Sequence, residues 1–201
     1  MRNPLKTVDA PTKLHAIIDR EPSTWLTHLS SLNQNEVPQI FVSALGTTKS
    51  KAGDMQGQRK VGFDLNLLIA ESAKKAGVKT YVLISGGMGG GENSRIPFVR
   101  MKAELEAAVK ALDFEHTVII KPGLIVGARS ESRPVEAIFR RTAQFLGVIS
   151  GGLLKDSWAQ DADIIGRAAV RAGLKTLDTQ SSVSKVWEVG QSDILSLGKA
   201  E

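Results

Sequence analysis

Three short stretches of glycine and small polar residues each follow an apolar run of the sequence. They are Leu45-Gly46-Thr47-Thr48, Ser85-Gly86-Gly87 and Lys121-Pro122-Gly123. Residues of this kind let the backbone approach a ligand closely and offer it hydrogen bonds. A glycine after a strand is also a common turn residue that binds nothing, and for any one stretch this is the simpler interpretation. Three such stretches around one edge of a sheet favour a ligand-binding cleft.

The cleft needs a sheet whose strands end together, and the apolar patterning predicts one. Strands are expected over 14–19, 38–45, 78–85, 116–123 and 183–189. Helices are expected over 22–32, 60–76, 97–112, 134–147 and 161–172, and the polar stretch 47–60 is expected to be a surface loop. Gly77 and Gly173 are expected to end helices, and Asp161 and Ser192 to begin them. Strands that alternate with helices in units of about 30 to 40 residues predict an α/β domain over 1–201, with helices on both faces of a mainly parallel sheet.

The composition excludes several kinds of site. The chain has 201 residues and no cysteine, which rules out disulfide scaffolds, iron–sulfur clusters and thiol nucleophiles. His15, His28 and His116 lack the spacing of a zinc motif, so no metal is expected. The formal net charge of +5 is too small and too scattered to predict nucleic-acid binding. No apolar run approaches the roughly 18 residues of a membrane-spanning helix, and residues 1–13 resemble neither a signal peptide nor an amphipathic presequence.

Three longer segments resemble atypical short-chain dehydrogenase/reductase-like proteins. They are ALGTT (44–48), DLNLLIAESAKKAGVKTYVLIS (64–85) and RMKAELEAAVKALDFEHTVIIKPGLIVGARSESRP (100–134). The resemblance is greatest to a fungal group assigned to the mitochondrial outer membrane and related to the Tat-interacting oxidoreductase-like proteins. It implies a Rossmann-like, doubly wound sheet, an oxidoreductase-like activity with NADP or NAD, and peripheral attachment to the mitochondrial outer membrane. If targeting is lost, a cytoplasmic location is expected instead.

The same resemblance suggests catalytic residues. In this family a serine after the central strand acts with a Tyr-x-x-x-Lys pair on the next helix, where positions i and i+4 share one face. Ser85 and Lys102 match the serine and the lysine, but Phe98 stands where the tyrosine is expected, and a phenyl ring cannot donate a proton. Relatives commonly carry a second serine where this chain has Gly86, so Ser85 is alternatively a hydroxyl that serves only the local backbone. Lys102, taken alone, is an ordinary solvent-facing lysine.

Cofactor contacts are also implied by the resemblance alone. Lys102 would hold the nicotinamide ribose, Arg2 would lie near an NADP 2′-phosphate, and Asp19 would meet the adenine. The loop after the strand at 38–45 would close on the adenine ribose and pyrophosphate, and the turn after the strand at 116–123 would lie beside the nicotinamide amide. The full set is Arg2, Asp19, Leu45, Gly46, Thr47, Lys102, Pro122, Gly123 and Leu124.

The sequence departs from the family in the segment before Leu14. Sheets of this type begin with a strand and a G-x-x-G-x-x-G turn that holds the cofactor pyrophosphate, and no such motif precedes Leu14. The glycine cluster at 86–91 follows the central strand, so it belongs to the active-site loop. We therefore expect the first β-α-β unit to be absent and NAD(P) affinity to be low. The edge left bare would be covered by a protein partner or a membrane surface.

Two functional hypotheses from different classes follow. In the first, the chain is an oxidoreductase-like protein with an NAD(P)-binding fold. In the second, it is a scaffold or binding protein that keeps the fold without the chemistry. Phe98, Gly86 and the absent glycine loop favour the second, and Lys102 with the Pro122-Gly123 turn favours the first. A basic surface module is a third interpretation that rests on the net charge alone, and the substrate stays undetermined.

Overall fold

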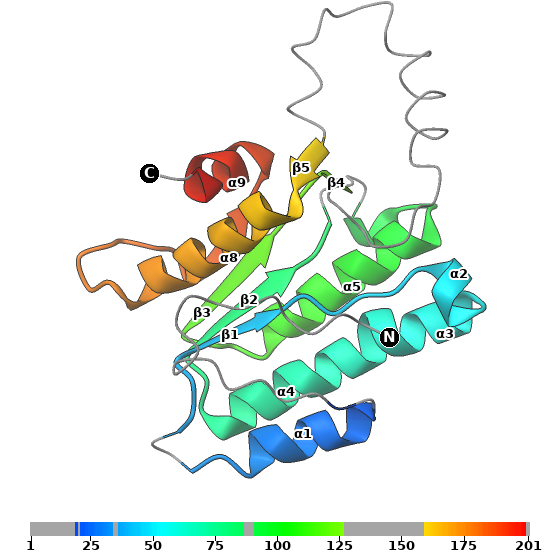
Figure 1. Ribbon diagram of the computed structural model, residues 1–201, viewed down its shortest axis with the longest axis horizontal. Coiled ribbons are helices and arrows are strands. Elements are labelled where there is room, and N and C mark those ends of the chain that lie inside the picture. Colours follow the sequence, from blue (N-terminus) through cyan, green and yellow to red (C-terminus); the bar gives the residue numbers. More distant parts are fainter. Residues whose placement is uncertain (1–18, 20, 34–35, 87–90, 127–158, 200–201) are drawn as a thin grey trace, which may run out of the picture.

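The main sheet has four parallel strands whose carboxyl ends lie at one edge (Figure 1). The computed structural model describes residues 19, 21–33, 36–86, 91–126 and 159–199. The strand order is β1 (Ile40–Ser43), β2 (Thr80–Ile84), β3 (His116–Ile120) and β6 (Val186–Val189). The register pairs Ser43 with Leu83, and Leu83 with Ile119. The predicted strands at 38–45, 78–85, 116–123 and 183–189 are confirmed with shorter bounds, and most of the one predicted at 14–19 lies outside the described residues.

Helices cover both faces of this sheet (Figure 1). On one face lie α4 (Asn66–Ala76) and α5 (Pro97–Ala111), with α1 (Pro22–Ser30) packed on the outside of α4. On the other face lie α8 (Ala162–Leu177) and α9 (Gln191–Gly198). The helices predicted over 22–32, 60–76, 97–112 and 161–172 are therefore confirmed, and so is the Rossmann-like α/β fold. The helix predicted over 134–147 lies outside the described residues.

Alternating side chains of the strands fill two apolar cores. Tyr81 and Leu83 of β2 point to the α4–α5 face, where they pack with Leu105, Val109 and Phe114. Val82, between them, points to the α8 face. Strands buried on both faces have nearly continuous apolar sequences, which is why the run at 78–85 could be recognised. The second core is completed by residues of β3, α8 and β6, among them Val118, Ile120, Ala168, Ala172 and Val189.

The segment 47–60 is largely helical, so the prediction of a surface loop was wrong. It forms α2 (Lys49–Ala52) and α3 (Met55–Arg59), and a π-helical segment η2 (Lys60–Leu65) leads on into α4. The Thr48 and Asp54 side chains begin the two short helices by accepting hydrogen bonds from backbone N–H groups. Almost every residue of α2 and α3 is exposed or half-buried, so no apolar period was present to indicate them.

Two predicted helix boundaries were also wrong. Gly77 ends α4 in the left-handed region with φ of 98°, as expected. Gly173, however, lies inside α8, where a Cβ atom would come within 2.9 Å of the Ile40 Cγ2 methyl. This glycine therefore permits close packing of α8 on β1. Gly190, rather than Ser192, precedes the first residue of α9.

Three short elements had no counterpart in the sequence prediction. β4 (Leu124–Val126) and β5 (Ala159–Asp161) pair in parallel as a small second sheet. Gly91–Asn93 forms the 3-10 turn η3 before α5. Asp161 caps α8 as predicted, with its side chain accepting a hydrogen bond from the Asp163 backbone N–H. The β4–β5 pair thus directs the chain away from the carboxyl edge of the main sheet and back into α8.

Candidate functional site

The three glycine-containing stretches follow neighbouring strands at the same sheet edge. The strands β1, β2 and β3 pair in parallel and end side by side, so the three stretches that follow them begin side by side. Among the described residues, a Cβ atom added at Gly46 or at Gly86 would meet nothing within 4 Å, so no described side chain covers the backbone there. Gly87 lies outside the described residues. The predicted shared edge is therefore confirmed, although the register alone does not show that it binds anything.

The loop after β1 is held in place by two buried amide side chains. The Asn66 side chain donates hydrogen bonds to the carbonyl of Leu45 at 3.3 Å and to that of Val61 at 2.9 Å. Its oxygen accepts from the Ser43 hydroxyl at 3.0 Å. Gln58 donates to the carbonyl of Thr47 at 3.4 Å. Neither amide was singled out from the sequence, although a fully buried asparagine on the apolar face of a helix could have been recognised as a partner for strand-end carbonyls.

Ser85 directs its hydroxyl to a carboxylate of the neighbouring helix. Its Oγ donates to Oε1 of Glu106 on α5 at 2.5 Å, and both residues are buried. The Ser85 backbone N–H donates to the carbonyl of Ile120, which fixes the residue between the ends of β2 and β3. A hydroxyl has one proton, so a Ser85 that donates to Glu106 has only acceptor positions left for a ligand.

Glu106 begins a chain of charges that links three strands to α5. Its second oxygen lies 3.0 Å from the Lys121 ammonium, which lies 2.8 Å from Glu188 on β6. Glu188 also pairs with Lys110 at 2.5 Å. The hydrogen bonds from Lys110 and then Lys121 lower the pKa of Glu188 to about 2. Desolvation acts to lower the pKa of Lys121, but its bonds to Glu188 and Glu106 outweigh burial and raise it.

Lys102 lies on the same face of α5 as Phe98 and Glu106, at successive spacings of four. Desolvation lowers the pKa of the Lys102 ammonium, and the nearby negative charge of Glu106 offsets part of this effect. Lys102 makes no hydrogen bond or close ion pair with any residue that the structure describes. The structure thus brings Ser85 and Lys121 together at Glu106 in the interior of α5, and Lys102 lies one turn earlier on the same helix.

A tyrosine cannot reach this site from elsewhere in the chain. The sequence has one tyrosine, Tyr81, and it is fully buried in β2. Its ring stacks between Phe41 and Phe114 with centroids 5.5 and 5.1 Å away. Burial raises the pKa of its hydroxyl to about 12. The count of one tyrosine, placed in the centre of an apolar strand, was the sequence signal for this conclusion.

The remaining residues predicted for the cofactor lie partly within the described chain. Pro122 is buried and Gly123 half-buried in the turn that leads into β4, of which Leu124 is the first residue. Asp19 precedes α1, where its carboxylate accepts from the Glu21 backbone N–H and its carbonyl from the Trp25 indole. These two hydrogen bonds join Asp19 to the first turn of α1, which packs on α4. Arg2 lies outside the described residues.

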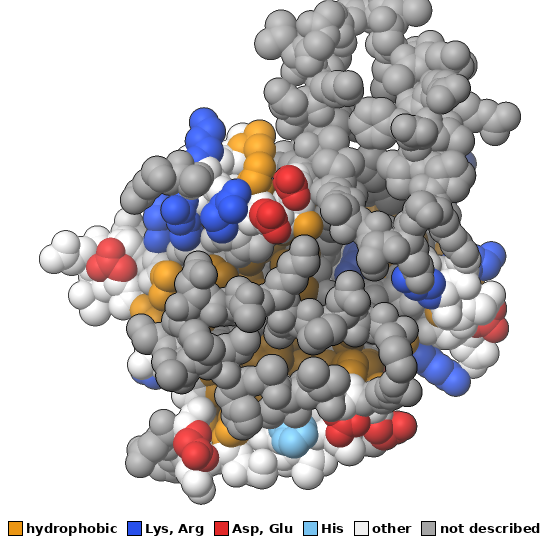
Figure 2. Space-filling model, viewed as in Figure 1, with side chains coloured by type: hydrophobic (Ala, Val, Ile, Leu, Met, Phe, Trp, Pro, Cys, Tyr) orange, Lys and Arg blue, Asp and Glu red, His pale blue; other side chains and the backbone are white. Residues whose placement is uncertain are grey.

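Positive side chains form separate groups on the face seen in Figure 2, one over α8 and α9 and another near α2 and α3. Two arginines of α8 are engaged with the end of α9. Arg167 donates to the Gly198 carbonyl at 2.8 Å, and Arg171 donates to the Leu197 carbonyl at 2.8 Å. Such contacts satisfy the free carbonyls of a helix end.

Among the described helices, none combines the length and the apolar character needed to cross a membrane.

Solved structures with similar folds are sugar-nucleotide and related enzymes. A UDP-Glc/GlcNAc 4-epimerase from Campylobacter jejuni matches 93% of this chain and 68% of its own, with a TM-score of 0.60 and 12% identity. The Bordetella bronchiseptica enzyme WbmG in complex with NAD matches 84% and 54%, with a TM-score of 0.53 and 15% identity. RMD from Pseudomonas aeruginosa complexed with NADPH matches 84% and 64%, with a TM-score of 0.53 and 16% identity. At such identities the likeness shows the fold alone.

Sequence relatives are much closer. No protein-family model matches the chain. "Protein fmp52-1, mitochondrial" of Aspergillus terreus is 48% identical over 200 residues, which cover 98% of this chain and 84% of the relative. "Protein fmp52, mitochondrial" of Emericella nidulans is 48% identical over 201 residues, and "Protein FMP52, mitochondrial" of Coccidioides immitis is 37% identical over 194 residues. At this identity and coverage, the chain belongs to the fungal Fmp52 family, whose members here are named as mitochondrial proteins.

Proposed function

We propose that this chain binds NADP or NAD at the carboxyl edge of its sheet as a peripheral protein of the mitochondrial outer membrane, and that it does not catalyse carbonyl reduction. One observation carries the absence of catalysis, namely the hydrogen bond from Ser85 to Glu106. Carbonyl reduction requires a proton donor directed at the substrate oxygen. Ser85 directs its single proton to Glu106 instead, so it offers an incoming carbonyl oxygen no hydrogen bond.

The lack of a phenol supports the same conclusion. Phe98 occupies the face of α5 that carries Lys102, and the single tyrosine of the chain is enclosed in the core. A side chain with no exchangeable proton cannot act as a general acid. The site is therefore better suited to binding than to proton transfer, as in the second of the hypotheses drawn from the sequence.

The open edge fits the nicotinamide and ribose part of a dinucleotide. The backbone at Gly46 and Gly86 is open, and the Lys102 amine is free of close partners among the described residues. Lysine donates to ribose hydroxyls, and open backbone accommodates flat rings and diphosphates. A bound cofactor would supply hydride chemistry, whereas this chain's residues would hold and orient it. The fold neighbours solved with NAD and NADPH support this use of the fold.

Titration of NADPH against the purified chain, followed by cofactor fluorescence, tests binding. We expect saturable binding, weakened about tenfold in Lys102→Ala because a charge-assisted hydrogen bond is lost. The matched control is Lys75→Ala, which removes an exposed lysine from the last turn of α4. Affinity should be unchanged in the control. Absence of saturable binding, or equal affinity in the two variants, would contradict the proposed role of the edge.

Catalysis is tested by NADPH oxidation with 9,10-phenanthrenequinone as the carbonyl probe. The alternative function, an active reductase, is favoured by the lowered pKa of Lys102, since a shielded ammonium can donate a proton. We expect no turnover above background in the wild-type chain or in Phe98→Tyr, because Ser85 still donates to Glu106. Turnover that is lost in both Ser85→Ala and Lys102→Ala would establish the reductase and overturn the binding-only function.

The location is tested on isolated fungal mitochondria. The relatives named as mitochondrial support the organelle, and the family resemblance supports its outer membrane. We expect the protein to be degraded by protease added to intact mitochondria and to be released from membranes by carbonate. Protection from protease would contradict outer-membrane attachment, and resistance to carbonate would contradict peripheral attachment.

A further inference from the structure

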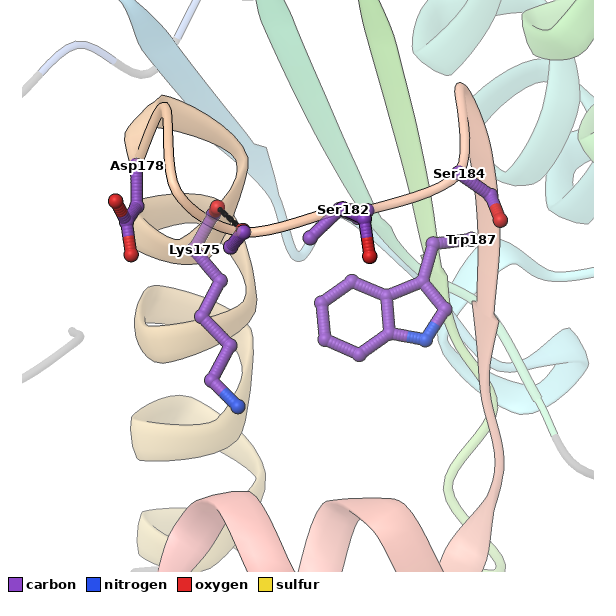
Figure 3. A pocket seen from close by; sticks show the side chains of 7 residues that line it. Lys175, Asp178, Ser182, Ser184 and Trp187 are labelled. Carbon is purple, nitrogen blue, oxygen red and sulfur yellow. Dashed lines mark hydrogen bonds between the residues drawn. The ribbon is translucent and has the colours of Figure 1, made fainter.

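A second concave site lies at the opposite end of the sheet from Ser85. It is bounded by the last turn of α8, residues 178–184 of the following loop and the start of β6, and we call it the Trp187 hollow (Figure 3). Its volume is about 340 Å³. This falls at the lower end of the range for small-molecule sites, about 300 to 1,000 Å³. None of the residues predicted for the cofactor lines it, so the hollow is separate from the proposed cofactor site.

The centre of the hollow is an indole with one packed side and one open side. Trp187 is half-buried and rests against the core that contains Val118 and Val189. Its N–H has no acceptor among the described residues. The other described tryptophan differs, because the Trp25 N–H donates to the Asp19 carbonyl at 3.2 Å. The Trp187 N–H is not a buried unsatisfied donor, so it is open to solvent, and a ligand in the hollow could use both the open ring face and this donor.

The groups around the indole are mainly hydrogen-bond donors. Lys175 extends along α8 on one side of the ring, and the Ser182 side chain lies close above it (Figure 3). Within the described part of the chain, the Lys175 ammonium has no ion pair. The backbone N–H groups of 182–184 likewise donate to no described residue. Asp178 is the acidic residue of the lining, and its carboxylate points away from the indole and accepts from the Gln180 backbone N–H.

We propose that the Trp187 hollow binds a flat aromatic anion, which stacks on the indole and pairs with Lys175. An aromatic ring complements the open indole face, and a carboxylate complements the ammonium and the unpaired N–H groups. A lysine in the last turn of a helix is favourable in any protein because of the helix dipole. The dipole does not account for the half-buried indole beside that lysine, which sets a flat apolar face next to an unpaired cation in one concave site.

The probe is 2-naphthoate, titrated into the ¹⁵N-labelled chain and followed by NMR. The sequence has three tryptophans, and Trp187→Phe assigns the indole signal of the hollow. We expect this signal to shift saturably and the Trp25 signal to stay in place. Lys175→Gln, an exposed and conservative change, should weaken binding about tenfold through loss of the ion pair. The matched control, Lys185→Gln, removes an exposed lysine that pairs with Asp113 outside the hollow.

Two further probes, one neutral and one non-aromatic, test the ion pair and the ring stacking separately. 2-Naphthamide keeps the rings without the charge, and cyclohexanecarboxylate keeps the charge without the rings, so both should bind more weakly than 2-naphthoate. The proposal is overturned if the Trp187 signal does not move at millimolar 2-naphthoate, if 2-naphthamide binds equally well, or if Lys175→Gln binds like Lys185→Gln. NADPH affinity should be the same in wild type and Lys175→Gln, so failure at one site is distinguishable from failure at the other.

Discussion

The carboxyl edge of the sheet and the Trp187 hollow use their polar side chains in opposite ways. At the carboxyl edge, Ser85, Glu106, Lys121 and Glu188 form one connected chain of hydrogen bonds and ion pairs. At the amino edge, the Trp187 hollow leaves its lysine and its indole N–H without partners among the described residues. Groups that satisfy one another rigidify the fold, whereas groups without partners are free to meet a ligand. The network around Glu106, at the edge that a Rossmann-like fold uses for its cofactor, is thus more internally satisfied than the Trp187 hollow.

Lys102 is the exception at the carboxyl edge. It lies beside Glu106 on α5 but has no close partner among the described residues, in contrast to Lys121 on the far side of the same carboxylate. Desolvation lowers the pKa of Lys102, whereas ion pairing raises that of Lys121. Two lysines near the Glu106 carboxylate therefore differ in function: Lys121 stabilises the fold, and Lys102 is available for binding.

The largest expected effect comes from removing Glu106. Glu106→Ala leaves the buried Ser85 hydroxyl and the Lys121 ammonium without their shared acceptor, so it should lower the free energy of unfolding by about 3 kcal/mol. Urea denaturation measures this change. The control is Glu104→Ala on the same helix, where the carboxylate pairs with Arg59 near the surface and should contribute less than about 1 kcal/mol. At the other end of the sheet, Lys175→Gln should leave the stability unchanged. Equal losses in all three variants would remove the contrast between the edges.

Much of this architecture was accessible from the sequence because buried elements carry a strong pattern. The apolar strand at 78–85, the helical period over 60–76 and the glycine at 77 each predict what the structure contains. The exposed helices α2 and α3 gave no such signal, since short helices depend on caps such as Thr48 and Asp54 rather than on an apolar face. Gly173 was wrongly predicted to end a helix for a different reason. Glycine is favoured both at helix ends and where a helix packs closely on a strand, and Gly173 is of the second kind.

The site was predicted less completely than the fold. The sequence indicated which strand ends meet, because parallel register follows from topology. It did not indicate that Glu106 accepts from Ser85, because a glutamate on an amphipathic helix resembles any solvent-facing residue until its neighbours are placed. The Trp187 hollow was not predicted, because its residues come from the end of α8, the start of β6 and a connecting loop that contains no motif.

A smaller effect should separate the two lysines beside Glu106. Lys121→Met removes a bonded cation and should destabilise the chain by about 1 to 2 kcal/mol at pH 7. Lys102→Met removes a desolvated charge, so it should be neutral or stabilising by up to about 1 kcal/mol. Because the folded pKa of Lys102 is lowered, its charged form opposes folding below the unfolded pKa of 10.5, and the benefit of methionine should shrink as the pH rises. Destabilisation by both methionine variants would show that Lys102 also has a structural function.

The smallest effect concerns Glu188, at the solvent-exposed end of the chain of charges. Its folded pKa is about 2 and its ordinary value is 4.5, so the carboxylate stabilises the fold above pH 4.5 and loses this contribution as the pH falls towards 2. The side chain is 45% exposed, so solvent screening should keep the contribution below about 1 kcal/mol. Thermal unfolding of wild type and Glu188→Gln should therefore diverge at pH 7 and converge near pH 2. If the two unfolding temperatures keep a constant difference over this interval, the contacts of Glu188 with Lys110 and Lys121 do not stabilise the folded chain. The stabilising part of the charge network at the carboxyl edge would then consist of Glu106 and Lys121.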